Sequence, residues 1–180
     1  MLPPGHIAAG YLTAYGFIHL SNSPFTPHET NILLLAGAIL GALPDIDIIP
    51  FFKGRATLYF TGSDTHRRYI THAPVLWLIL GLTIALEAPN PFIRDIGLLI
   101  WLAPWGHFVG DSIEYGVRWL WPFSKRYFSL GSYPNRDLKS EKNLVQHYWG
   151  IIKIYSRKSL TFPLEVVLVL TALAVLINNH

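Results

Sequence analysis

The sequence predicts an all-α fold, an integral membrane bundle of about five apolar helices. Apolar residues make up 51% of the 180-residue chain and charged residues only 14%, against about 25% charged residues in an ordinary soluble domain. Five nearly uncharged runs recur along the chain, and proline-, asparagine- and serine-rich loops separate several of them. We expect residues 1–180 to fold as a single domain. The chain has no cysteine, which excludes disulfides and thiolate metal sites.

We predict helices near residues 6–20, 31–49, 73–88, 92–110 and 162–177, and a basic, aromatic and loop-rich region at 112–160. The first run contains glycines, which membrane helices tolerate. In the second run, Gly37 and Gly41 have the GxxxG spacing that permits two helices to approach closely, although this spacing also arises by chance. Pro44 is expected to kink or end the second helix where its first aspartate appears.

The third and fourth helices are expected to be antiparallel neighbours. Pro74 suits the first turn of the third helix. The Pro-Asn-Pro reversal at residues 89–91 is too short for any other arrangement of the two helices that it joins. The fifth run, with sequence FPLEVVLVLTALAVLI, is the most apolar in the chain.

The apolar runs are short for membrane spans. None reaches the roughly 20 residues that cross a bilayer comfortably, and the third run covers only about 24 Å at about 1.5 Å per residue. Either the helices extend into their flanks or some of them are partly embedded. The alternative interpretation is a soluble helical protein with a large core, because runs of about 10 to 14 apolar residues are often buried helices.

The placement of basic residues favours the membrane interpretation. With a cytoplasmic N-terminus and five spans, thirteen of the fourteen Lys and Arg residues lie on the cytoplasmic side, and only Arg94 lies opposite. This asymmetry matches the excess of Lys and Arg found in cytoplasmic loops. We therefore predict an integral protein of the cell membrane.

Four short polar segments interrupt the apolar pattern: His6, residues 43–47 (LPDID), residues 66–72 (HRRYITH) and residues 107–111 (HFVGD). The topology drawn from the charges brings all four to the cytoplasmic end. In the last segment, His107 and Asp111 stand four residues apart and share one face of a helix. Imidazole and carboxylate groups are good ligands for zinc or manganese, although a helix-end ion pair also explains this spacing.

The two central segments carry further candidates. In extended geometry, Asp45 and Asp47 would point the same way, and such a pair can bind or bridge metal ions, or one carboxylate can act as a base. The alternative is a solvated helix end. Arg67 suits bidentate binding of a phosphate, or else contacts with lipid headgroups. Thr71 is expected to cap the helix that begins at residues 73–74.

Together the polar segments predict a divalent metal site at the cytoplasmic end of the bundle. The candidate ligands are His6, Asp45, Asp47, His66, His72, His107 and Asp111, and the candidate catalytic residues are Asp47 and Arg67. Seven ligands exceed the three or four protein ligands that one zinc ion takes. We therefore expect one or two divalent ions, zinc first and manganese as the alternative. Two-metal sites activate water and stabilise displacement at phosphorus.

These motifs resemble the YdjM-like family of predicted membrane-bound, metal-dependent hydrolases. The family pattern LPDxD, HRxxTHS and HxxxD with a trailing WPF is matched at the residues named above and at 121–123, although three residues rather than two separate Arg67 from Thr71. The resemblance extends from His6 to the end of the stretch GVRWLWPFS at residues 116–124. Ala73 departs from the usual serine. More distantly, an all-helical fold with His and Asp ligands is similar to zinc phospholipase C and P1 nuclease, although their N-terminal tryptophan ligand is absent here. That likeness implies a phosphoester substrate.

The resemblance and the predicted site imply a hydrolase that acts on a membrane phosphoester, such as a phospholipid or a polyprenyl phosphate, by metal-activated attack of water. The aromatic and basic stretch 118–128 would then contact lipid headgroups. The alternative is a non-enzymatic metal-binding membrane protein, either a sensor or a transporter component. Ionisable groups at one end of the bundle, rather than at the bilayer midplane, favour chemistry at the surface. Nucleic-acid binding through the basic region 118–158 is disfavoured, because its charges suit anionic lipid as well.

Overall fold

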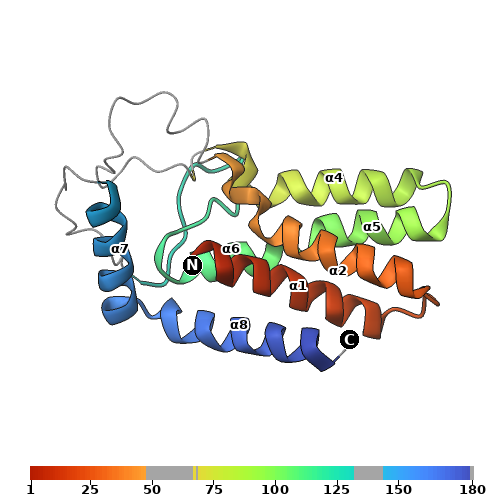
Figure 1. Cartoon of the computed structure of the whole chain (residues 1–180). Helices are drawn as coiled ribbons and strands as arrows, with labels where there is room; N and C mark the ends of the chain where they lie inside the picture. The colour runs from red at the N-terminus through yellow and green to blue at the C-terminus, as the bar shows by residue number, and fades with distance from the viewer. Residues whose placement is uncertain (48–66, 68, 132–143, 179–180) are drawn as a thin grey trace.

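The computed structural model describes residues 1–47, 67, 69–131 and 144–178. These parts of the chain are helical, with one isolated β-bridge between Val117 and Phe128. The elements, drawn in Figure 1, are α1 (Pro3–Leu20), α2 (Pro27–Ala42), η1 (Leu43–Asp47), η3 (Ile70–His72), α4 (Pro74–Glu87), α5 (Pro91–Leu102), α6 (Pro104–Glu114), α7 (Leu144–Lys158) and α8 (Thr161–Asn178). The expected all-α fold is confirmed.

Glycines bring α1 and α2 into backbone contact. A Cβ atom on Gly10 would overlap the carbonyl oxygen of Gly37 and would lie 2.7 Å from the Cα atom of Gly41. The two antiparallel helices therefore touch through their backbones, as small residues allow in membrane bundles. This close approach, predicted from the GxxxG spacing, places the start of α1 beside the end of α2.

The helices α4 and α5 form a second antiparallel pair, as the short reversal between them predicted. A Cβ atom on Gly81 would lie 2.6 Å from the carbonyl oxygen of Gly97. The side chain of Asn90 accepts a hydrogen bond from the backbone N–H of Ile93 and so caps α5. Figure 1 shows that this reversal and the α1–α2 connection lie at the same end of the bundle, opposite the N-terminus.

The second predicted helix begins earlier and ends differently from the expectation. Thr26 and Glu29 form a capping box, so α2 starts at Pro27 rather than near residue 31. The α-helix then gives way to the 3₁₀-helix η1, because Pro44 has no N–H to donate to the preceding turn. Asp45 and Asp47 therefore lie on a 3₁₀-helix rather than on an extended segment. Residues 48 and 49, expected in this helix, lie outside the described residues.

The fourth predicted helix is divided in two. The α-helix α5 ends at Leu102, and α6 begins at Pro104, which cannot continue the hydrogen-bond ladder of α5. Helix α6 ends at Glu114. The chain turns at Gly116, whose φ of +90° suits glycine and whose N–H donates to the carbonyl oxygen of Asp111 at 2.8 Å. Helix α6 packs closely on α1, since a Cβ atom on Gly106 would lie 2.8 Å from the Cβ atom of Ala9.

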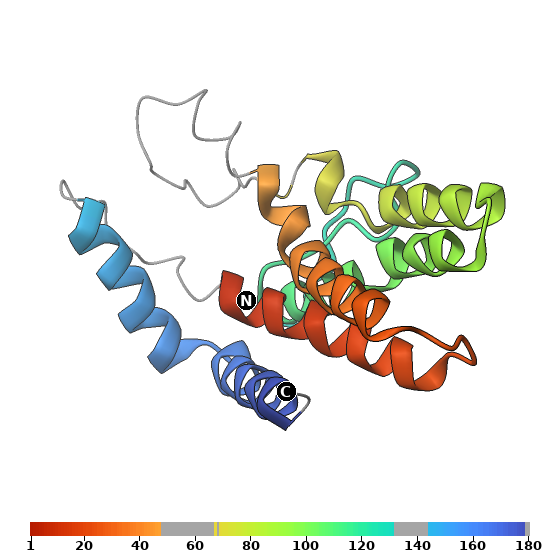
Figure 2. The ribbon, with the colours of Figure 1, turned by 45° about the vertical axis from the view of Figure 1, so that its right-hand side comes forward.

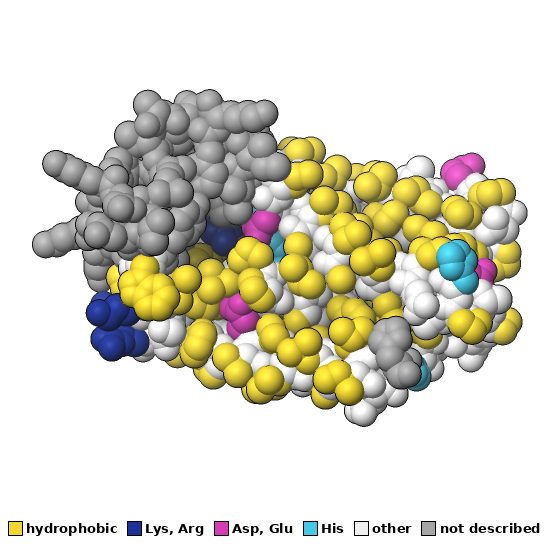
Figure 3. Space-filling model, viewed as in Figure 1, with side chains coloured by type: hydrophobic (Ala, Val, Ile, Leu, Met, Phe, Trp, Pro, Cys, Tyr) yellow, Lys and Arg dark blue, Asp and Glu magenta, His cyan; other side chains and the backbone are white. Residues whose placement is uncertain are grey.

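Three segments of the described chain are long and apolar enough to cross a membrane: Pro27–Asp47, Pro91–Glu114 and Thr161–Asn178. Helix α4 is a shorter apolar helix, and α1 is not among the candidates. Only 22% of the first span and 17% of the last are buried within the protein, so most of their apolar surface is available to lipid. Figure 3 shows this apolar surface spread over the face formed by α1, α2 and α8.

Helix α7 lies inside the region 112–160, which was expected to be rich in loops. Figures 1 and 2 place α7 at the end of the bundle that holds the N-terminus, at a steep angle to α8. Its side chains Trp149 and Lys153 are exposed. Basic and aromatic residues dominate the sequence pattern of this region, and for that reason the helix was not predicted.

Two carboxylates tie α8 to the bundle. Glu165 of α8 accepts hydrogen bonds from the backbone N–H groups of Leu2 and Gly5, at 3.1 and 3.2 Å, at the start of α1. In return, Glu114 at the end of α6 accepts from the N–H groups of Leu160 and Thr161, at 2.8 and 3.2 Å, at the start of α8. Each helix start is thus capped by a side chain from a distant part of the chain.

Candidate metal centre

Helix α1 carries His6 into the interior of the bundle. The side chain is fully buried, and neither ring nitrogen has a hydrogen-bond partner among the described residues. Its Nε2 atom lies 3.5 Å from Oδ1 of Asp111 and 4.0 Å from Oδ2 of Asp45. The ring stacks on that of His107 with centroids 3.7 Å apart. Buried polar atoms are normally paired, so the nitrogens of His6 are available to bind a ligand.

The tautomers of two further histidines follow from their acceptors. Nδ1 of His107 lies 3.0 Å from the carbonyl oxygen of Gly41, which only accepts, so Nδ1 carries the proton. Nδ1 of His72 likewise donates to Oδ2 of Asp47 at 2.7 Å. The two Nε2 atoms lie 3.1 Å apart. When His72 is protonated, its Nε2–H donates a hydrogen bond to Nε2 of His107; when both rings are neutral, two lone pairs face one another and a cation between them would relieve their repulsion.

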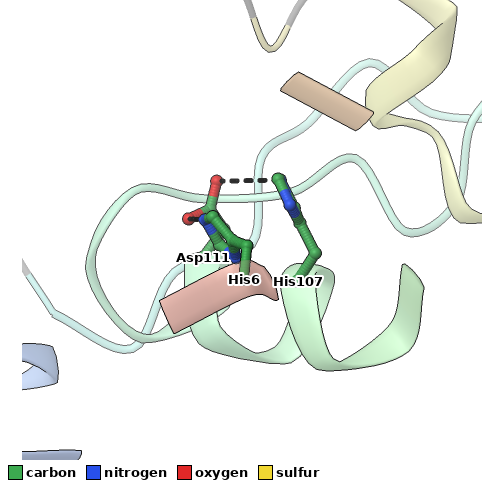
Figure 4. A group of neighbouring side chains, drawn as sticks. All are labelled: His6, His107 and Asp111. Carbon is green, nitrogen blue, oxygen red and sulfur yellow. Dashed lines mark ion pairs between the residues drawn. The ribbon is translucent and has the colours of Figure 1, made fainter. Parts of the chain in front are cut away.

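Carboxylates from two elements complete the arrangement. Oδ1 of Asp45 lies 3.4 Å from Nε2 of His72 and 3.7 Å from Nε2 of His107. Oδ2 of Asp111 lies 3.8 Å from Nε2 of His107. The ligand atoms form two overlapping groups, each within 4.8 Å: one group is His6, His107 and Asp111, and the other is Asp45, His72 and His107. Figure 4 shows the first group, in which His6 comes from α1 and the other two residues come from α6.

The spacing of these atoms suits a divalent cation. Four ligands on a tetrahedral zinc ion at about 2.1 Å lie about 3.4 Å from one another. The Nε2 atom of His72 lies 3.1 Å from that of His107 and 3.4 Å from Asp45 Oδ1. Imidazole nitrogens and carboxylate oxygens are ligands for zinc and for manganese. The residues present therefore fit a bound divalent metal, and His107 belongs to both groups.

The structure places Asp47 behind His72 rather than in either group of ligand atoms. Its Oδ2 atom accepts hydrogen bonds from Nδ1 of His72 and from Oγ1 of Thr71, each at 2.7 Å. A carboxylate that holds the far nitrogen of a metal-binding histidine fixes its tautomer and its orientation. Thr71 therefore does not cap α4 as expected, and the capping position, Ala73, makes no side-chain hydrogen bond.

The carboxylate of Asp111 is fully buried and is held by two cations. Nε of Arg67 donates to Oδ2 at 2.5 Å, and the α-ammonium group of Met1 donates to Oδ1 at 2.9 Å. The guanidinium group of Arg67 also lies over the ring of Tyr115, 4.5 Å from its centroid. A buried carboxylate is stable only with such partners. These two cations offset two of the three aspartate charges of the site, and a protonated His72 or a bound cation can offset the third.

Without a metal ion, the contacts of His72 within the protein favour its protonated form. Burial alone lowers the pKa of His72, but hydrogen bonds to the carboxylates of Asp45 and Asp47 outweigh burial and raise the pKa above its ordinary value. In the protonated ring, Nε2 carries a hydrogen and has no lone pair for a metal. A proton and a metal ion therefore compete for this atom.

The stretch 116–124, which ends in WPFS, makes hydrogen bonds to two segments that carry site residues. The side chain of Arg118 donates to the carbonyl oxygen of Tyr69 at 3.0 Å, which holds the segment that leads into η3. Nε1 of Trp119 donates to Oγ of Ser112 at 2.8 Å, next to Asp111 on α6. Beyond these contacts, Leu120 and Phe123 are 69% and 94% exposed. The stretch therefore links two site-bearing segments and presents large apolar side chains on its outer side.

Most residues singled out in the sequence meet at this site. The structure brings together five with direct ligand geometry and two in contact with them: His6, Asp45, His72, His107 and Asp111, then Asp47 and Arg67. His66 lies outside the described residues. Sequence reasoning missed the carbonyl of Gly41 and the amino group of Met1, because backbone groups leave no signal in the residue pattern.

The comparisons with known proteins add one match. A family model described as YdjM inner membrane protein matches residues 1–180. Searches among curated proteins and among solved structures found no match.

Proposed function

The chain belongs to the YdjM inner membrane protein family, and we propose that it is a metal-dependent hydrolase that cleaves a phosphoester at the membrane surface. The observation that carries this proposal is the convergence of the Nε2 atoms of His72 and His107 with the carboxylate of Asp45, all within 4.8 Å of one another. We assign zinc to the site, with one or two ions and with manganese as the alternative.

The residues of the site would have different roles in hydrolysis. A bound divalent ion supplies Lewis-acid chemistry and lowers the pKa of water, which is what attack at phosphorus requires. Asp47 keeps Nδ1 of His72 protonated and its Nε2 atom directed at the site. The buried guanidinium of Arg67 holds Asp111 in place and adds positive charge next to the position of a phosphoryl group.

The surroundings support a substrate that belongs to the membrane. The site lies at one end of a membrane bundle, where α1 begins and α2 ends (Figure 1). Exposed Leu120 and Phe123 reach outward nearby, and α7 at the same end carries Arg157 and Lys158 in its last turn. Apolar and basic side chains at one level suit the headgroup region of an anionic leaflet. We propose that this end faces the cytoplasm and that the phosphoester is a lipid one.

The test measures metal content and turnover in the same preparations. Purified protein in detergent is analysed for metal by mass spectrometry and is assayed on phosphomonoester and phosphodiester lipids. We expect Asp45→Asn to lose bound zinc and turnover. The matched control is Asp95→Asn, because Asp95 is a buried aspartate that lies near the start of α5, at the far end of the bundle. Retention of zinc and full activity by Asp45→Asn would show that the proposed site is wrong.

The second candidate function is a non-enzymatic metal-binding membrane protein, such as a sensor or a transporter component. It is favoured by the complete burial of His6, His72, His107 and Asp111, since a site with most of its ligands closed off from solvent resembles a structural zinc site rather than a catalytic one. Bound zinc without turnover on any lipid phosphoester, in protein that retains its fold, would support this function over the hydrolase.

A further inference from the structure

An apolar groove on the outside of the bundle leads to the metal centre. It has a volume of about 650 Å³ and runs between α1 and α2, where Ile7, Leu35 and Ile39 contribute to its walls. Asp45 is the only charged residue in its lining. The same carboxylate has Oδ1 3.4 Å from Nε2 of His72. The groove and the metal centre therefore share a side chain.

A second cavity continues the groove toward α8. It has a volume of about 310 Å³, and Tyr11, Val169 and Leu173 contribute to its lining. Ile7 and Ala38 line both cavities. The walls include α2 and α8, which are the two least buried of the candidate membrane spans. In a bilayer this surface contacts lipid, so hydrocarbon chains rather than water occupy it.

We propose that the groove between α1 and α2 holds a hydrocarbon chain of the substrate, so that a lipid phosphoester enters sideways from the bilayer with its phosphate at Asp45. This inference rests on the proposed hydrolase function. The volume falls within the range of about 300–1,000 Å³ typical of small-molecule sites. An extended chain lying along α2 would end where the ligand atoms of Asp45 and His72 begin.

A lipid chain fits the groove better than a further helix does. A helix packed along the groove would bury the partly exposed carboxylate of Asp45 under apolar side chains and close the access to it that a substrate needs. A lipid instead brings an apolar chain to the apolar walls and a polar group to the polar end. Because lipid tails are as apolar as the bilayer that they leave, the groove contributes position rather than affinity.

The first test compares substrates that differ only in chain length. Turnover of dipalmitoyl and dibutyryl phosphatidic acid is measured for the wild type and for Ala38→Trp, which fills the groove. We expect the variant to lose about ten- to a hundredfold in kcat/KM on the long-chain substrate only, because a misplaced chain misplaces the phosphate. Leu170→Trp is the matched control, since Leu170 is 61% exposed and lines neither cavity.

Ile39→Trp provides a second groove variant in case Ala38→Trp fails to fold, because Ile39 is 53% exposed and its replacement does not disturb the α1–α2 contact. Equal kcat/KM values on both substrates, in the wild type and in a folded groove variant, would overturn the proposal.

The second test does not depend on turnover. Phosphatidic acid with a diazirine on its acyl chain is photo-crosslinked to the full chain in phosphatidylcholine vesicles. We expect labelling of α1 and α2 along the groove to fall when unlabelled phosphatidic acid is added, while labelling around Leu170 does not saturate. Saturable labelling without turnover would refute the hydrolase and keep the groove. Turnover without saturable labelling, or crosslinks between two copies at the groove, would refute the groove and keep the hydrolase.

Discussion

Replacing Asp47 with alanine removes the oxygen that accepts from both Nδ1 of His72 and Oγ1 of Thr71, each at 2.7 Å. His72 then loses the group that fixes its tautomer, and its ring is free to turn. Losses of this kind lower metal affinity by about ten- to a hundredfold, which corresponds to about 1.4 to 2.8 kcal/mol. We expect zinc affinity to fall by this factor while the bound stoichiometry at saturating zinc is unchanged.

Two companion variants separate the contributions. Asp47→Asn keeps an oxygen that can accept from His72, so we expect a smaller loss of zinc affinity than in the alanine variant. Thr71→Val removes only the hydroxyl donor and leaves the bond to His72 in place. Its cost is the net value of one hydrogen bond, about 1 kcal/mol.

The assay is competition for zinc against a chelator of known affinity, with metal counted by mass spectrometry in the same samples. Asp45→Ala is the reference for loss of a direct ligand. If Asp47→Ala abolished zinc binding to the same extent as Asp45→Ala, Asp47 would be a ligand rather than a support, and the reasoning from the two 2.7 Å contacts would be refuted.

Two further predictions concern the fold and the pH. Gly10→Ala forces a Cβ atom onto the backbone of Gly37 and Gly41, which cannot move aside as a side chain can, so we expect about 3 kcal/mol of destabilisation. The measurement is unfolding in detergent. Gly16→Ala is the control, since a Cβ atom there meets nothing within 4 Å. The pKa of His72 is raised without metal, and zinc must displace one proton from the protonated ring. We therefore expect zinc affinity to be highest and constant above that pKa, and to fall by about tenfold per pH unit below it. Competition titrations from pH 8 to pH 5 measure this slope, and an affinity independent of pH would contradict it.

Local spacing predicted those parts of the site that a single element determines. His107 and Asp111 share a helix face because they are four residues apart, and Gly37 and Gly41 permitted close approach because both lie on one side of α2. The relation between Asp45 and Asp47 was not predictable in the same way. An extended segment would point both carboxylates at one target, whereas the 3₁₀-helix after Pro44 places one among the ligand atoms and the other behind His72.

Contacts between distant segments account for the rest. The ring of His6 stacks on that of His107 because α1 packs on α6 where Gly106 meets Ala9, and no pattern within either helix specifies that pairing. Glu114 continues the face of His107 and Asp111 in the sequence, yet it turns away to cap α8. Side chains that cap a distant helix start cannot be distinguished from candidate ligands by spacing alone.

The capping of α1 by Glu165 has a consequence for biosynthesis. The helix that carries His6 is made first, but the carboxylate that accepts from its opening N–H groups belongs to the last helix of the described chain. Helix α8 is itself little buried, so these polar ties secure it to the bundle more than packing does. A chain truncated before α8 would therefore lack the carboxylate that caps the start of the helix carrying His6.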